Sequence, residues 1–380
     1  MTAERTYDRS MHKDSAPPIV IIAMNTFRAG GSQTYAFTLA KMLKDQGFRP
    51  VLVAKSGPWF KEATKSAQVI RVLWSEGTAH GTPNPAKRMV LRATETLSAI
   101  RLSSLVRQAA LVITSQPGPT SFFSSKSSRH WPKIKQLALV HGTSAVEWPF
   151  PDHARTLGRL NGLLAATDET SAFLCKSAPG KTVRDIGNLF RGELFWGERL
   201  DQIIQEYRPS GPVVFLGTLT PNKTGPLSAL FSAVASLDAR LVVVGGGPHE
   251  SALRKLAEDS GLAHRISFAG AVSDPRPWIT QAAVVVTAGR GAIESMAAGR
   301  PTLIATSDGV HGLANLDNLA ELERFNFTGR TPSSREPSTE LMTRELTSGF
   351  QLNATERVEI AKRMGSVGSI NPIIQAINES

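Results

Sequence analysis

Short apolar runs alternate with helical segments in two successive series, and this pattern constrains the fold more than any other feature. The first series predicts strands at residues 19–24, 51–54, 111–114, 137–140, 162–166 and 183–186, and the second at 213–216, 241–244, 266–269, 284–286 and 302–305. Runs that are apolar throughout are typical of parallel strands covered on both faces. We therefore predict an α/β fold with two Rossmann-like lobes that face a central cleft at the carboxyl ends of their strands.

The length of 380 residues is too great for one simple core and suits two domains. A segment rich in Glu, Arg, Phe and Trp separates the two series. We predict a disordered tail at residues 1–17, a first lobe at 18–190, a linker at 191–211, a second lobe at 212–330, and C-terminal helices at 331–380 that pack back across the lobes.

Cysteine usage and the apolar runs indicate the compartment. Cys175 is the single cysteine of the sequence, which excludes a disulfide framework and a cysteine metal site. Residues 1–17 are polar and lack the apolar core of a signal peptide. Other apolar runs are far too short to cross a membrane. We expect a cytoplasmic location.

Positive charge is concentrated in the first half of the chain. Residues 1–190 hold 25 Lys and Arg against 12 Asp and Glu, whereas residues 191–380 hold 18 against 20. This asymmetry indicates that one lobe faces an anionic partner, such as a lipid surface, a nucleic acid or a phosphorylated acceptor. No nucleic-acid-binding signature or basic-aromatic interleaving is present, so we expect no nucleic acid.

Residues 286–300 carry the pattern most indicative of function. An apolar strand ends in a turn with Gly289 and Gly291, and the following helix carries one carboxylate, Glu294, before Gly299 and Pro301. A helix start approached through glycines offers backbone N–H groups and a positive dipole end to an anion. A single carboxylate beside it suits two ribose hydroxyls. The stretch therefore indicates a nucleotide pocket, with a buried β-turn-α unit and a solvated Glu as the alternative.

Six features in a fixed order resemble one known family. They are Gly30-Gly31, His141-Gly142, Ile186-Gly187-Asn188, Gly217 followed by Lys223, Gly245-Gly246-Gly247-Pro248, and the Glu294-Ser-Met-Ala-Ala-Gly-Arg-Pro segment. This order, spanning residues 18–330, is similar to that of GT-B glycosyltransferases of the family-4, group 1 type, which are retaining enzymes. The resemblance implies a nucleotide-sugar donor in the second lobe and an acceptor in the first.

Lys223 stands where this family has its diphosphate-binding lysine. A leaving nucleotide diphosphate needs positive charge as its own negative charge grows. Family members pair that lysine with an arginine directly after the strand glycine, and here that position is Thr218. Arg290, in the glycine turn, is our candidate for the missing cation, with a surface arginine as the alternative.

Glu294 stands at the second, ribose-binding glutamate of the family's paired motif. The first glutamate falls on Val286 by counting, and matching Gly289-Arg290-Gly291 to the family's Gly-aromatic-Gly leaves no carboxylate either. The departure allows a divergent subfamily, a different donor sugar or lost activity. The resemblance implies that donor-binding residues are Gly30, Gly31, Gly217, Thr218, Lys223, Gly289, Gly291, Ala292 and Glu294.

His141 ends a predicted strand, at the place where the family has a histidine near the transferred sugar. With Lys223 and Arg290 it completes our set of candidate catalytic residues. An NAD site at Gly30-Gly31 fails, because the spacing is not Gly-x-Gly-x-x-Gly and Lys55 stands where a ribose-binding acid is expected. The other histidines lack metal-ligand spacing, so we expect no metal and no cofactor.

The sequence therefore predicts a retaining glycosyltransferase that acts on a cell-envelope, glycolipid or natural-product acceptor. One alternative is a catalytically silent GT-B subunit that binds nucleotide or acceptor and supports a partner enzyme. A nucleotide-sugar 2-epimerase is a second alternative, which the depleted glutamate pattern disfavours. The oligomeric state stays open.

Residues 85–107 predict a helix with cations among apolar residues. One face can pack on the lobe while Arg88, Arg92 and Arg101 face an anionic surface. This pattern favours a peripheral location at the inner face of the membrane, where a lipid-linked acceptor is reached without a membrane span. An ordinary lobe helix with a solvated charged face is the alternative.

Overall fold

The computed structural model describes residues 16–28, 30–74, 85–127, 131, 134–143, 148–150, 153–272 and 274–379. The chain forms two compact units. The first unit comprises Met1–Leu189 and Gly368–Ser380, and the second comprises Phe190–Val367. The chain therefore passes between the units twice. The tail predicted at residues 1–17 lies outside the described residues up to position 15.

The first unit is built on a seven-stranded parallel sheet with the order β3-β2-β1-β4-β5-β6-β7. Central strands β1 and β4 are almost wholly buried, as their uninterrupted apolar sequences predict. The strands are β1 Ile19–Thr26, β2 Arg49–Lys55, β3 Gln68–Arg71, β4 Ala109–Ser115, β5 Gln136–Val140, β6 Gly162–Ala165 and β7 Val183–Asp185.

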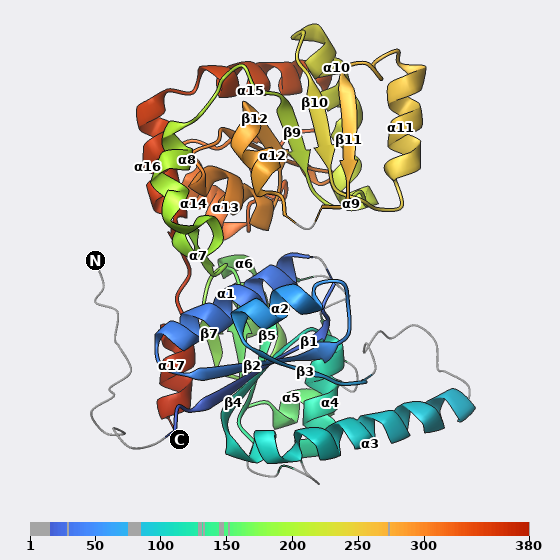
Figure 1. The fold of residues 1–380 in the computed structure, drawn as a ribbon, viewed down its shortest axis with the longest axis vertical. Coiled ribbons are helices and arrows are strands. Elements are labelled where there is room, and N and C mark those ends of the chain that lie inside the picture. Colours follow the sequence, from blue (N-terminus) through green and yellow to red (C-terminus); the bar gives the residue numbers. More distant parts are fainter. Residues whose placement is uncertain are drawn as a thin grey trace. The chain divides into compact units, whose positions relative to one another are not determined.

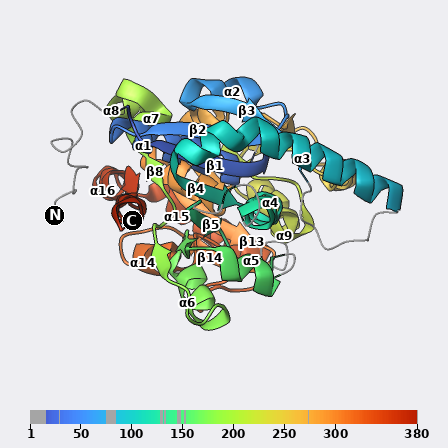
Figure 2. The ribbon, with the colours of Figure 1, turned by 90° about the horizontal axis from the view of Figure 1, so that it is seen from below.

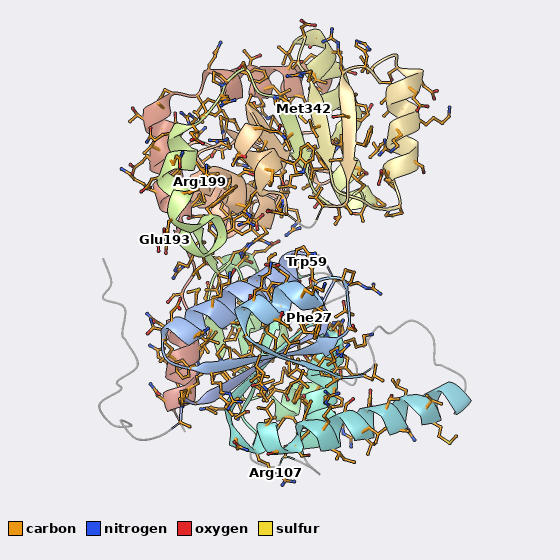
Figure 3. The ribbon with its side chains drawn as sticks, in the orientation of Figure 1. Phe27, Trp59, Arg107, Glu193, Arg199 and Met342 are labelled. Carbon is orange, nitrogen blue, oxygen red and sulfur yellow. The ribbon has the colours of Figure 1, made fainter. Side chains whose placement is uncertain are left out.

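Helices flank this sheet (Figure 1). They are α1 Gly31–Asp45, α2 Phe60–Ser66, α3 Pro85–Gln108, α4 Pro117–Ser127, α5 His153–Arg159, α6 Asp168–Ser177 and α17 Asn371–Asn378. An aromatic cluster of Trp74, Phe122, Phe123 and Trp131 joins α4 to the core under β1, β2 and β4. After β1 and β2, the Phe27 carbonyl accepts a hydrogen bond from the Trp59 N–H at 2.8 Å, and both residues are labelled in Figure 3.

The second unit is built on a six-stranded sheet with the order β11-β10-β9-β12-β13-β14, in which β14 runs antiparallel to β13. Its strands are β9 Val213–Leu216, β10 Leu241–Val244, β11 Ile266–Gly270, β12 Val284–Thr287, β13 Thr302–Thr306 and β14 Gly309–Leu313. A two-stranded sheet pairs β8 Phe190–Arg191 with β15 Ser366–Val367.

The helices of the second unit cover both faces of its sheet, since buried side chains from alternate strand positions form two separate clusters. They are α7 Gly192–Trp196, η2 Gly197–Arg199, α8 Leu200–Gln205, α9 Pro221–Thr224, α10 Leu227–Ser236, α11 Glu250–Asp259, α12 Arg276–Gln281, α13 Arg290–Ala297, α14 Leu319–Arg324, α15 Thr339–Gln351 and α16 Ala354–Met364. Met342 of α15, labelled in Figure 3, is fully buried in one of these clusters.

Two segments outside the predicted lobes fold as parts of these units. Residues 191–211, predicted as a linker, form α7, η2 and α8, and Trp196 and Ile203 are buried in the second unit. Among the predicted C-terminal helices, α15 and α16 belong to the second unit and α17 to the first.

Each predicted strand is present, with bounds that differ by a residue or two at the ends. Four further strands, β3, β8, β14 and β15, were not predicted. β3 is a four-residue edge strand without a buried residue, and β14 contains Gly309 and Gly312. Both lack the uninterrupted apolar run on which the prediction depended.

Both sheets have a topological switch point, where successive connections leave a central strand in opposite directions. In the first unit it lies between β1 and β4, and in the second between β9 and β12. In open α/β sheets, the carboxyl ends of the strands at such a point are where ligands bind. The predicted site residues are therefore expected around these two pairs of strand ends.

Candidate functional site

Beside the second switch point, the loops after β9 and β10 pack backbone against backbone. Gly217 and Thr218 follow β9, and a Cβ on Gly245 would lie 1.9 Å from the carbonyl oxygen of Gly217. Gly245 also has a φ of +141°, and a Cβ on Gly247 would lie 2.4 Å from the carbonyl oxygen of Leu219. These glycines are required because the two loops approach too closely for any side chain.

The start of α13 is equally tight. Gly289 precedes this helix with a φ of +66°, and a Cβ on Gly291 would lie 2.6 Å from Oγ1 of Thr287. The Gly289 N–H donates to the Phe327 carbonyl at 2.8 Å, and the Ala292 N–H donates to the Gly289 carbonyl at 3.0 Å. Two of the N–H groups that we predicted to face an anion are thus engaged within the unit.

Glu294 is a buried acid one helical turn after the glycine turn. Its side chain is 7% exposed, and Nε of Arg290 donates to its Oε1 at 3.2 Å. The Arg290 guanidinium also lies over the ring of Phe190, 5.1 Å from the centroid. Burial raises the pKa of Glu294, while the charge and hydrogen bond of Arg290 oppose that rise. Arg290, which lies over the Phe190 ring, therefore offsets part of the pKa rise that burial causes.

The two predicted cations of this site, Arg290 and Lys223, lie on different helices. Arg290 belongs to the Glu294 pair, and its side chain is 10% exposed. Thr218 is exposed at the end of β9 and brings no charge. The backbone of Lys223 lies in α9, close in sequence to that strand end, but the Lys223 side chain lies outside the described part of the structure.

His141 lies at the carboxyl end of β5 in the first unit. Its Nε2 is 2.9 Å from Oγ of Ser115, the last residue of β4, and its ring meets the Tyr35 ring edge-on at a centroid distance of 4.9 Å. The Tyr35 hydroxyl donates to the carbonyl of Gly187 at 2.7 Å. Because Tyr35 belongs to the helix that starts at Gly31, the structure brings His141 and this helix together.

Side-chain amides complete the first switch point. The Asn25 N–H donates to Oε1 of Gln116 at 2.9 Å, which bridges the ends of β1 and β4. Gln116 has a φ of +79°, an uncommon conformation for a residue with a side chain. Gln33 donates from Nε2 to the Thr26 carbonyl at 2.9 Å, and the Gly30 carbonyl accepts from the Gln33 N–H.

The predicted site residues therefore form two groups, one in each unit. Gly30, Gly31 and His141 lie in the first unit, and Gly217, Thr218, Lys223, Gly289, Arg290, Gly291, Ala292 and Glu294 lie in the second.

The sequence reasoning missed Ser115, Gln116, Tyr35 and Phe190. A signal was present for the first two, because Ser115-Gln116-Pro117 directly follows an apolar strand. No local signal marks Phe190, whose ring lies against a side chain 100 positions further along the chain.

Two Rossmann-like units with glycine-rich strand ends define the GT-B class, and comparison with solved structures supports this fold. HepE from Anabaena, in complex with UDP and glucose, matches with a TM-score of 0.65 and 14% identity over 95% of this chain and 98% of HepE. Sucrose-phosphate synthase from Thermosynechococcus elongatus matches with a TM-score of 0.57 and 16% identity over 96% of this chain and 100% of that one. At such identities the likeness concerns the fold alone.

Residues 211–332, within the second unit, match the family described as Glycosyl transferases group 1, which confirms the group 1 part of the predicted resemblance for this segment. A GDP-mannose-dependent α-(1-6)-phosphatidylinositol monomannoside mannosyltransferase of Mycobacterium tuberculosis is 36% identical over 115 residues. That match covers 26% of this chain and 30% of the relative, so it spans less than a third of either protein.

Proposed function

We propose that the protein is a retaining glycosyltransferase that moves a sugar from a nucleotide-sugar donor to a cell-envelope, glycolipid or natural-product acceptor. One observation carries the proposal. A buried, arginine-paired carboxylate follows a glycine turn at the switch point of the second sheet, within the segment that matches group 1 glycosyltransferases. This combination suits a nucleoside diphosphate better than an isolated phosphate, because a carboxylate repels phosphate and accepts from ribose hydroxyls.

In this proposal the second unit holds the donor. Glu294 accepts from the ribose, the glycine turn at Gly289 and Gly291 lets the nucleotide approach the backbone, and Lys223 stabilises the leaving diphosphate. The mannosyltransferase relative uses GDP-mannose, whereas structures of HepE hold UDP or UDP-glucose. The experiment below therefore includes the nucleotide sugars of both GDP and UDP.

The transfer step needs no covalent nucleophile from the protein. The bond between the anomeric carbon and the donor phosphate oxygen breaks, and the acceptor hydroxyl oxygen bonds to that carbon on the same face. The acceptor proton passes to the departing phosphate oxygen, which leaves as part of the nucleoside diphosphate. Positive charge near the diphosphate lowers the barrier because negative charge develops there.

The first unit holds the acceptor and one contact to the transferred sugar. His141 hydrogen-bonds a sugar hydroxyl or phosphate in this proposal, and Ser115 and Tyr35 hold the imidazole in place. The enzyme acts in the cytoplasm, peripherally at the inner face of the membrane when its acceptor is lipid-linked.

A thermal-shift panel of GDP, UDP, GDP-mannose and UDP-glucose tests the proposal, because a ligand that binds only the folded chain raises Tm. At least one nucleotide should raise Tm, and the matching nucleotide sugar should then support transfer or slow hydrolysis. Lys223→Ala should lower kcat with less effect on nucleotide affinity. Lys255→Ala, which removes a 73% exposed lysine of the same unit, is the matched control. No shift with any of the four ligands would contradict the proposal.

A silent nucleotide-binding subunit is the second candidate, and the missing first glutamate favours it. Val286 at that position is a fully buried residue of β12, and the glycine turn after it carries Arg290 rather than a carboxylate. A chain that binds nucleotide but neither transfers nor hydrolyses any donor until a second protein is added would support this candidate.

A further inference from the structure

Helix α3 presents an apolar face on each of two opposite sides. Ala99, Leu102 and Val106 are buried in the core of the first unit. Among the described residues, six large hydrophobic side chains are exposed, and four of them lie on α3. Their exposed fractions are 71% for Met89, 61% for Val90, 67% for Leu97 and 63% for Ile100. We call these four residues the outer stripe. Packing on the first unit accounts for only one of the two apolar faces.

Helical geometry places the four residues of the outer stripe on one side of α3. At 3.6 residues per turn, its four side chains fall within roughly 100° of the helix circumference. Ala99, Leu102 and Val106 are centred about 160° away, on the side that packs against the sheet. Exposed hydrophobic residues that are scattered singly need no explanation, but a stripe along three turns of one helix indicates a binding surface.

Cations border this stripe on both sides. Arg92 and Arg101 are exposed; Arg101 falls about 20° beyond one edge of the stripe and Arg92 about 60° beyond the other. Arg107 in the last turn points away from the sheet (Figure 3). Glu95 is the one acidic residue of α3 and falls on the far side, about 170° from the centre of the stripe. The outer face of α3 is therefore apolar along its middle and positive along its edges.

The position of α3 makes this face accessible. The N-terminal half of α3 extends beyond the sheet of the first unit in both views (Figures 1 and 2). Within the described residues, no helix is long and apolar enough to cross a membrane, and α3 has a strongly charged sequence. Its pattern suits a helix that lies in an interface rather than one that spans it.

We propose that the outer stripe of α3 docks the protein on an anionic lipid bilayer, with the four apolar side chains among the headgroups and upper acyl chains and the arginines on lipid phosphates. A second copy of the chain fits less well, because pairing two such faces brings their arginines together. A standard protein interface also uses about 20–30 residues a side, far more than this stripe offers. The inference builds on the proposed peripheral location and is independent of the transfer reaction.

Vesicle flotation of the full chain tests this surface without any donor or acceptor. The protein should float with phosphatidylcholine vesicles that contain phosphatidylglycerol, should not float with phosphatidylcholine alone, and should dissociate as salt screens the charges. Arg92→Gln/Arg101→Gln should weaken the partition coefficient about 30-fold at low salt. Lys61→Gln/Lys65→Gln removes the same charge from exposed positions of α2 and should change it little.

The apolar contribution is tested separately. Leu97→Gln/Ile100→Gln should weaken partition at least about tenfold without changing Tm, because both side chains are exposed in the free protein. An environment-sensitive dye on Ile100→Cys, in a Cys175→Ser background, should shift its emission to the blue with anionic vesicles. The same dye on Lys61→Cys should not shift.

Three results would overturn the proposal. The first is no flotation with phosphatidylglycerol vesicles at low salt, and the second is flotation that neither double variant weakens. The third is a dimer mass in solution that Leu97→Gln/Ile100→Gln converts to a monomer, which would assign the stripe to a second copy. Nucleotide binding by a protein that fails to float would leave the transferase proposal standing, and flotation without nucleotide binding would do the reverse.

Discussion

The two switch points have the same strand topology but are built from different chemistry. In the first unit, side chains fill the space between strand ends: Ser115 meets His141, and Gln116 bridges to Asn25. In the second unit, backbone packs against backbone beside the switch point, where Gly245 after β10 approaches the Gly217 carbonyl after β9 too closely for a Cβ. The side chains there, Arg290 and Glu294, are buried in a pair of their own.

The first unit therefore offers side chains to a ligand at its strand ends, whereas the second unit offers mainly backbone. A glycine-lined strand end suits a ligand whose phosphates must approach the main chain, as a nucleotide does. A strand end with a histidine, a serine and a tyrosine offers hydrogen bonds whose pattern changes readily with sequence. In the proposed function, the second unit serves the nucleotide, which is the invariant part of the reaction, and the first unit serves the parts that vary.

The largest expected effect comes from disrupting the backbone packing between the loops after β9 and β10, beside the second switch point. Gly245→Ala places a Cβ against the Gly217 carbonyl at a φ of +141°, and should lower the free energy of unfolding by about 3 kcal/mol or more. Gly142→Ala is the matched variant in the first unit, because a Cβ there meets no atom of the described residues within 4 Å. It should change stability by less than about 1 kcal/mol. Urea unfolding measures both, and equal losses would contradict the comparison.

The next effect concerns the buried pair. Arg290→Met leaves the Glu294 carboxylate buried without its cation and should lower the free energy of unfolding by about 3 kcal/mol at neutral pH. Arg290→Met/Glu294→Gln should regain at least half of that loss, because no uncompensated charge remains. A double variant as unstable as the single one would show that Arg290 acts through Phe190 rather than through Glu294.

Nucleotide affinity should respond to Glu294 itself. Glu294→Gln keeps the shape but replaces a charged acceptor by a neutral one, and should weaken binding of the nucleotide found in the thermal-shift panel by about 1.5–3 kcal/mol. Isothermal titration measures the change in Kd. Unchanged affinity in a folded Glu294→Gln protein would remove the ribose assignment from this residue.

The same variant gives a pH test of the buried carboxyl. Burial raises the pKa of Glu294 in the folded chain above its ordinary value of 4.5. The folded state therefore binds more protons than the unfolded state between that value and the raised pKa, and stability falls as pH rises through this window. The free energy of unfolding of the unmodified protein, relative to that of Glu294→Gln, should therefore fall as pH rises through this window. If this difference in free energy of unfolding rose with pH instead, the surroundings of Glu294 would favour its ionised form.

The smallest expected effect lies in the first unit. Ser115→Ala removes the hydroxyl that holds His141 and should lower kcat by about 3- to 10-fold with little change in KM for the donor. Ser121→Ala is the control, because its buried hydroxyl has no hydrogen-bond partner among the described residues. A change in KM without a change in kcat, or an equal loss of kcat in Ser115→Ala and Ser121→Ala, would show that Ser115 does not position the imidazole.

The sequence by itself determined the two series of parallel strands and the residues at their carboxyl ends. The apolar runs are long enough to identify each strand locally, and a parallel sheet places all their ends on one edge. His141 and Glu294 were found for this reason, since each follows an apolar strand. The pairing of Arg290 with Glu294 was also implicit, because residues four apart meet on a helix. Edge strands such as β3 and β14 stayed hidden, because β3 has no buried residue and Gly309 and Gly312 interrupt the apolar sequence of β14.

Only the tertiary structure decided what surrounds those residues. Phe190 under Arg290, the Gly217 carbonyl under Gly245 and Ser115 beside His141 are contacts between segments whose separation in sequence carries no local signal. The outer stripe of α3 was hidden for a related reason. Its apolar residues resemble those of any amphipathic helix, and only packing shows which ones the core leaves exposed. Local periodicity determines which residues share a face, whereas burial depends on which other segments reach that face.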